Sequence, residues 1–134
     1  MRFRTDRVEG SALDLDEVLG LYHDSGLGAR RPLADRERFA AMTANADLVL
    51  VARDEAGTLL GILRAVSDFS YVTYVSDIAV TAGRQRTGIG RALIDAARDE
   101  APAAKLVLLS APAAAGYYPH IGFTRHESAW VLNP

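Results

Sequence analysis

The chain has 134 residues, no cysteine, and 15 basic against 17 acidic side chains, which gives a net charge of −2. This length fits one domain over residues 1–134, and the near balance of charge argues against a nucleic-acid-binding protein, which usually carries a basic excess. The lack of cysteine excludes disulfides, thiolate metal ligands and a cysteine nucleophile, and the three histidines have no metal-binding spacing, so we expect no metal.

The first part of the chain predicts a short strand followed by two helices. Residues 1–8 predict the strand. Residues 14–23 predict a helix because Leu15, Val18 and Tyr22 recur at helical spacing. Residues 35–44 predict the second helix. The N-terminus lacks an export signal and no apolar run could cross a bilayer, so the expectation is a cytoplasmic protein without a membrane partner.

The middle of the chain is rich in β-branched residues. Residues 48–53, 58–66 and 71–80 predict three strands, and the segments between them are short and polar. Strands that follow one another through tight turns pair antiparallel. We therefore expect an antiparallel meander here.

The last third predicts a parallel crossover and an irregular end. Residues 88–101 predict a helix with an apolar stripe, and residues 105–109 predict a buried strand. Residues 113–120 predict a short helix, and residues 123–132 predict one or two closing strands. The predicted fold class is α+β: a mixed, mostly antiparallel central sheet with one β-α-β crossover, flanked by about four helices.

The loop between the third meander strand and the next helix is the most informative segment. The first N–H groups of a helix lack internal partners and lie at its positive end, so they favour an anion such as pyrophosphate. The loop has no lysine, which excludes a Walker A loop, and Leu93 stands where a dinucleotide fingerprint needs a small residue. The segment instead matches the pattern Gln/Arg-x-x-Gly-x-Gly/Ala over residues 85–90, Gln85-Arg86-Thr87-Gly88-Ile89-Gly90.

This segment resembles the acetyl-CoA motif of the GNAT acetyltransferase superfamily, and the resemblance extends over residues 48–132. It implies a bulged strand that diverges from its parallel neighbour, with pantetheine in the gap and acetyl-CoA as cosubstrate. The residues that it assigns to acetyl-CoA are Ile78, Ala79, Val80, Gln85, Arg86, Thr87, Gly88, Ile89, Gly90 and Arg91.

The segment Tyr117-Tyr118-Pro119-His120-Ile121-Gly122-Phe123 is similar to the aromatic-Tyr-x-x-x-Gly-Phe end of GNAT enzymes. The resemblance implies that Tyr118 gives a proton to the departing CoA thiolate as a general acid. The alternative is a packing aromatic with a polar tip. The chain departs from the family at Ala111, where many relatives carry an asparagine that contacts CoA.

Asp77 is the first candidate for the base that deprotonates the acceptor amine, because relatives often carry an acidic residue there. The alternative is that Asp77 pins its strand or binds the substrate. Acceptor contacts in the family come from the first helices, the hairpins and the last strands. The acceptor-binding candidates are Tyr22, Arg31, Tyr74 and Trp130.

The sequence thus predicts an acetyl-CoA-dependent N-acetyltransferase that acts on a primary amine of a small molecule by direct attack. The alternatives are an acyl-CoA-binding sensor without turnover, and an acetyltransferase for protein lysines or N-termini. The resemblance and the exposed edge strands also make a homodimer plausible.

Overall fold

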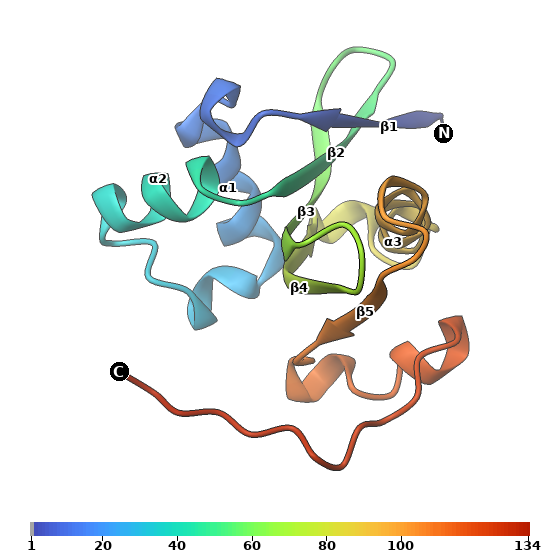
Figure 1. The fold of residues 1–134 in the computed structure, drawn as a ribbon. Helices are drawn as coiled ribbons and strands as arrows, with labels where there is room; N and C mark the ends of the chain where they lie inside the picture. The colour runs from blue at the N-terminus through green and yellow to red at the C-terminus, as the bar shows by residue number, and fades with distance from the viewer. Residues whose placement is uncertain (1) are drawn as a thin grey trace.

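A five-stranded mixed sheet forms the centre of residues 2–134, the part of the chain that the computed structural model describes (Figure 1). The spatial order follows the chain order, β1 to β5. Neighbours β1 to β4 pair antiparallel and β5 pairs parallel to β4, which confirms the predicted α+β fold. The strands are β1 (Phe3–Val8), β2 (Leu48–Asp54), β3 (Leu59–Ser67), β4 (Val72–Val80) and β5 (Lys105–Leu108).

Three α-helices within residues 2–134 cover the two faces of this sheet. They are α1 (Leu15–Ser25), α2 (Arg36–Ala44) and α3 (Ile89–Glu100). Asp14 begins α1, because its carboxylate accepts hydrogen bonds from the first backbone N–H groups of the helix. The apolar side chains form two clusters, one beneath α1 and α2 and one beneath α3. The sheet is therefore the middle layer of three (Figure 1).

A bulge in β4 shifts its pairing with β3. Arg64 pairs with Asp77, whereas the next residue of β3, Ala65, pairs with Val75, so Ser76 is an extra residue on β4. A bulge bends its strand and re-aims the neighbouring side chains. On the other side, β4 pairs with β5 only over residues 72–75. Residues 76–80 of β4 thus have no strand neighbour there, and the two strands diverge.

Two predictions for the segment around β5 were wrong in part. The strand predicted as buried over residues 105–109 ends at Leu108 and is half exposed: Val107 on this outer strand is 38% exposed, and Leu109, directly after it, is 51% exposed. The helix predicted at residues 113–120 is instead two 3-10 turns, η4 (Pro112–Ala114) and η5 (Tyr118–Ile121). Proline at the start of each turn and the short run between glycines Gly116 and Gly122 leave no room for a longer helix.

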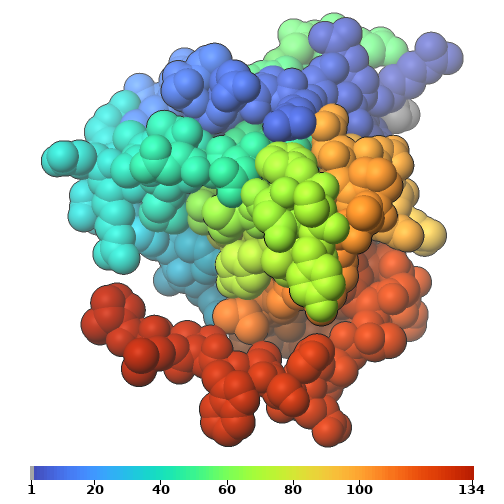
Figure 2. Space-filling model, viewed as in Figure 1, coloured from blue at the N-terminus to red at the C-terminus, as the bar shows by residue number. Residues whose placement is uncertain are grey.

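The closing strands predicted at residues 123–132 do not form. This segment is irregular and extends along the lower edge of the molecule (Figures 1 and 2), and Trp130 and Leu132 are 92% and 98% exposed. A further strand would have to pair with the outer edge of β5, which is only four residues long.

Between residues 2 and 134, no helix combines the length and apolar character needed to cross a membrane. The predicted homodimer stays a prediction.

Candidate active site

A pocket of about 90 Å³ opens where β4 leaves β5. Four segments far apart in the sequence meet there: the turn after α1, the bulged part of β4, the end of β5, and the first residues of the C-terminal segment. The lining residues are Leu27, Arg30, Arg31, Val75, Ser76, Asp77, Ile78, Leu108, Leu109, Ala111, Ala114 and Tyr118. The pocket therefore brings together four of the predicted site residues, Arg31, Asp77, Ile78 and Tyr118.

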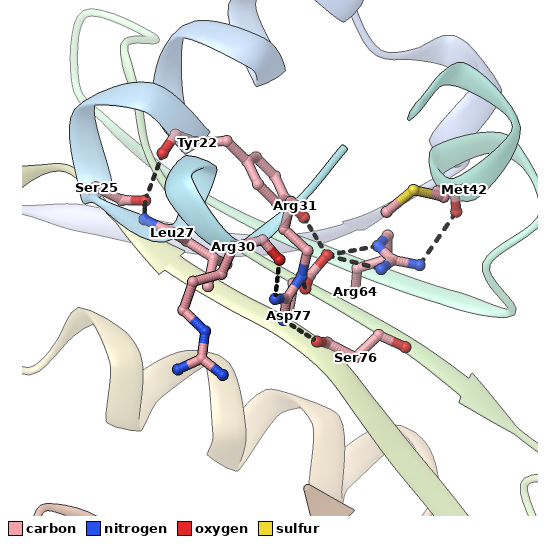
Figure 3. Close-up of polar contacts among 9 residues, drawn as sticks. All are labelled: Tyr22, Ser25, Leu27, Arg30, Arg31, Met42, Arg64, Ser76 and Asp77. Carbon is pink, nitrogen blue, oxygen red and sulfur yellow. Dashed lines mark hydrogen bonds and ion pairs between the residues drawn. The ribbon is translucent and has the colours of Figure 1, made fainter. Parts of the chain in front are cut away.

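Asp77 forms the floor of this pocket and is 2% exposed. Its Oδ1 accepts a hydrogen bond from Arg31 Nε at 2.5 Å, and its Oδ2 accepts one from the Tyr22 hydroxyl at 2.7 Å (Figure 3). Arg64 also donates to Oδ2, from Nε at 2.8 Å. A buried carboxylate needs such partners, because an unpaired buried charge is costly. Asp77 is thus held between two guanidinium groups.

Arg64 is a member of this cluster that the sequence analysis missed. It lies on β3 with its side chain 12% exposed, and its Nη1 donates a hydrogen bond to the carbonyl oxygen of Met42 in α2. Burial alone would lower the pKa of Arg64, but the neighbouring Asp77 carboxylate outweighs it, and the pKa is raised. Arg64 remains charged. The sequence did carry a signal for this residue, because Arg64 is an arginine inside an otherwise apolar predicted strand.

Arg31 connects the cluster to the pocket surface. Its three nitrogens donate to Asp77, to the Arg30 carbonyl oxygen at 2.8 Å, and to the Ser76 carbonyl oxygen at 3.1 Å. These bonds hold the turn after α1 against the bulge of β4 (Figure 3). The bulge thus gains one more function: its Ser76 carbonyl is an anchor for Arg31.

The other predicted acceptor contacts lie outside the pocket lining. Tyr22 is fully buried beneath it, and its pKa is raised by burial and by the adjacent Asp77 charge. Tyr74 is 36% exposed on β4, where it pairs with Val66 of β3. Trp130 is 92% exposed on the C-terminal segment. Of the four candidates, only Arg31 lines the pocket.

Tyr118 lies on the opposite wall of the pocket, at the start of η5. Its ring packs edge-to-face against Phe123 and Tyr117, with centroids 5.4 Å apart in both pairs. Burial raises the pKa of the Tyr118 phenol, and Tyr117 adds to the effect. The phenol therefore stays protonated at neutral pH and can donate a proton.

The glycine-containing loop runs from the end of β4 to the start of α3. Two of its residues have positive φ, Arg86 at 65° and Gly88 at 93°. Gly88 is the N-cap of α3, and no side chain caps this helix. The first N–H groups of α3 thus lack intrahelical partners, and they lie at the positive end of the helix. Together with the nearby arginines Arg84, Arg86 and Arg91, they could hold a phosphate group.

Hydrogen bonds to β4 and α1 fix the shape of this loop. Gln85 donates from Nε2 to the Val80 carbonyl oxygen at 3.0 Å and to the Ser25 carbonyl oxygen at 3.2 Å. Asp24 accepts hydrogen bonds from the Thr81 hydroxyl and from the Ala82 N–H, and these bonds lower the pKa of Asp24. Gln85 therefore shapes the loop through its side chain, and the Thr87 hydroxyl adds a hydrogen bond to the Arg84 carbonyl oxygen. In the part of the chain that is described, no three His, Asp or Glu side chains are grouped as a metal site requires.

Solved structures share this arrangement of elements. A GNAT-family acetyltransferase from Streptococcus pneumoniae TIGR4 is 22% identical, with a TM-score of 0.77 over 99% of this chain and 100% of its own. The aminoglycoside N-acetyltransferase AAC(6′)-Iy in complex with CoA is 15% identical, with a TM-score of 0.73 over 99% and 95%. A ribosomal-protein-alanine N-acetyltransferase from Brucella melitensis biovar Abortus 2308 is 20% identical, with a TM-score of 0.72 over 99% of each chain.

Sequence comparison gives the family. No curated protein sequence matches this chain. The sequence model of the acetyltransferase (GNAT) domain matches residues 22–133, which include the glycine loop, the bulged strand and Tyr118. Because this match covers most of the chain, the protein belongs to the GNAT acetyltransferase family.

Proposed function

We propose that this protein transfers the acetyl group of acetyl-CoA to a primary amine of a small molecule, with Tyr118 as the general acid. The observation that carries the proposal is the meeting of Tyr118 with the open side of β4 in one pocket. The volume of about 90 Å³ is well below that of a complete ligand site. Only the reacting ends of the two substrates would therefore lie inside it.

The residues around the pocket fit acetyl-CoA, which would supply the activated acetyl thioester. The backbone of Ile78, Ala79 and Val80 has no strand neighbour on the β5 side, so it could pair with an extended pantetheine arm. The backbone N–H groups of residues 86–91 would bind the pyrophosphate. Ala111 and Ala114 line the pocket with short side chains on the side of the C-terminal segment. These side chains take up little of the space between that segment and β4.

Tyr118 would act when the acceptor nitrogen bonds to the acetyl carbon and the carbon–sulfur bond breaks. The departing thiolate then takes the proton of the Tyr118 phenol. The acceptor nitrogen loses a proton to solvent or to a base, and the Tyr118 phenolate regains a proton from solvent. The raised pKa keeps the phenol protonated over the whole physiological range, and a general acid must hold its proton before it can donate it. Hydrophobic packing against Phe123 holds the ring in place.

Asp77 has two proposed roles, base and positioning residue. Its contacts favour positioning, because both of its oxygens already accept hydrogen bonds from Tyr22, Arg31 and Arg64. In this role Asp77 orients Arg31 at the pocket surface, and the acceptor loses its proton to water. A sensor without turnover would need neither the phenol nor this arrangement.

An assay of free-thiol release tests the proposal. The purified protein is mixed with acetyl-CoA and a panel of primary amines, and the released CoA thiol is measured; the protein adds no thiol of its own because it has no cysteine. We expect release that depends on the amine, with an N-acetylated product of matching amount. Acetyl-CoA binding without release on any small amine would contradict the proposal and favour the sensor or a protein acceptor.

A further inference from the structure

The charged groups of the pocket do not balance. Its lining contains two arginines, Arg30 and Arg31, and a single carboxylate, Asp77. Arg64 adds another positive charge directly beneath the carboxylate, with 2.7 Å between Arg64 Nη2 and Asp77 Oδ2. The side of the pocket formed by the turn after α1 is therefore electropositive, although the whole chain has a net charge of −2.

The one carboxylate is not available to a cationic substrate. Asp77 is buried, and its two oxygens accept hydrogen bonds from Tyr22, Arg31 and Arg64. An ammonium group in the pocket would have to displace one of these guanidinium groups from its partner. The pocket lining thus has no free carboxylate that could bind a polycationic acceptor.

The arginines, in contrast, keep free donors. A guanidinium group has five N–H donors, and the three hydrogen bonds of Arg31 leave two of them. The Arg30 side chain is exposed and projects away from the Asp77 cluster (Figure 3). Among residues 2–134 it has no carboxylate within ion-pair distance and makes no side-chain hydrogen bond.

We propose that the acetyl acceptor carries a carboxylate beside the amine that is acetylated, so that the substrate class is amino acids or close analogues. This inference rests on the proposed function and names its substrate. Arg31 presents its two free donors at the pocket surface, and the exposed Arg30 lines the same pocket. A guanidinium group suits a planar carboxylate, which it can bind through paired N–H donors. The small pocket suits a short spacing between the amine near Tyr118 and the carboxylate near Arg30.

The first test compares amines that differ only in the carboxylate. The common L-amino acids that carry a primary amine and no thiol, and their C-terminal amides, are assayed for thiol release with acetyl-CoA. The amide has the less basic amine, which favours its attack, so a preference for the acid would reflect binding and not amine basicity. We expect kcat/KM for at least one acid to exceed that of its amide by about 10- to 100-fold, the range for a hydrogen bond to a charged group.

The second test removes the proposed anion partner. Arg30→Gln should raise KM for the preferred acid about tenfold or more while KM for acetyl-CoA stays within twofold, and Arg30→Lys should restore part of the loss. Arg98→Gln is the matched control, because Arg98 is an exposed arginine of α3 outside the pocket. Calorimetric titration of the same acid into the CoA-loaded protein gives a second readout, in which Arg30→Gln should weaken binding to the same extent.

Two outcomes would overturn the inference and leave the proposed function standing: amides that react as well as their acids, or a preference for spermidine over every amino acid. Failure of acetyl-CoA to bind, with no thiol release on any amine, would instead overturn the proposed function. The two failures are therefore distinguishable in one series of experiments.

Discussion

The two walls of the pocket are built in opposite ways. One wall rests on the cluster of Asp77, Tyr22 and Arg64, which come from two strands and a helix and satisfy one another's polar groups; Asp77 and Tyr22 are buried and Arg64 is nearly so. On the other wall, Tyr118 comes from a short 3-10 turn, and the chain is exposed from residue 124 to residue 134. One wall is part of the core, whereas the other is attached to it by a few aromatic contacts.

This difference separates what holds the fold from what performs the chemistry. A buried network of charges contributes its largest effect when one partner is removed, because the others are then left unpaired. A partly exposed phenol contributes little to stability and can contribute much to a proton transfer. Substitutions on the two walls should therefore change different measured quantities.

The largest effect is expected on turnover, from Tyr118→Phe. Loss of the phenol should lower kcat by about 10²- to 10⁴-fold, the usual contribution of general acid catalysis, with little change in acetyl-CoA binding. Steady-state kinetics of thiol release measures it. Tyr117→Phe is the control, since Tyr117 is a neighbouring phenol that does not line the pocket. An equal loss in both variants would contradict the assignment.

The next effect is expected on stability, from Asp77→Asn. The substitution leaves the Arg31 and Arg64 guanidinium groups without their carboxylate, and breaking such a buried pair costs about 3–5 kcal/mol. Urea unfolding measures the change in free energy of unfolding. Asp95→Asn on α3 is the exposed control. A variant that stays stable but loses its activity below neutral pH would favour the base role instead.

A smaller effect is expected in the glycine loop, from Gly88→Ala. Gly88 has φ 93°, a conformation that costs an alanine about 1–2 kcal/mol, so the loop should shift. We expect KM for acetyl-CoA to rise about tenfold, the factor that 1.4 kcal/mol represents, while kcat changes little. Gly83→Ala is the control, because the same loop leaves open space for its methyl group. Equal KM values for the two variants would contradict this use of the loop.

The pH dependence of stability reports on Tyr22. Burial and the Asp77 charge raise the pKa of its phenol above the ordinary value of 10 in the folded state. Above pH 10 the unfolded state loses this proton and the folded state does not, so stability falls with rising pH by up to about 1.4 kcal/mol per unit. Urea unfolding at pH 9 to 11 should show a steeper fall for the wild type than for Tyr22→Phe. Tyr71→Phe, at an exposed tyrosine, should keep the wild-type slope.

The smallest effect is expected in the C-terminal segment, from Trp130→Ala. Trp130 is 92% exposed, so the free energy of unfolding should change by less than about 0.5 kcal/mol. Urea unfolding at two protein concentrations measures it. A larger, concentration-dependent loss would mean that this residue is buried against a second chain. An increase in acceptor KM at unchanged stability would support its predicted contact with the acceptor.

Local patterns in the sequence were enough to predict most of the framework. The strands of the meander and α3 depend on residues close together in the chain. Tyr118 was singled out by the family resemblance, and the helix predicted around it was wrong. The Asp77 cluster could not be predicted in the same way, since Arg64 meets Asp77 only through sheet pairing and the bulge at Ser76. The closing strands predicted at residues 123–132 were wrong, because a strand also needs a partner edge, and the outer edge of β5 is only four residues long.

Calorimetric titration of acetyl-CoA into the wild-type protein tests the central claim most directly. The claim is that the open side of β4, the loop before α3 and the wall bearing Tyr118 form a single cosubstrate site. We predict one binding site per chain, and the Tyr118→Phe variant should bind with the same affinity. The absence of binding heat, supported by an unchanged melting temperature at saturating acetyl-CoA, would contradict the account.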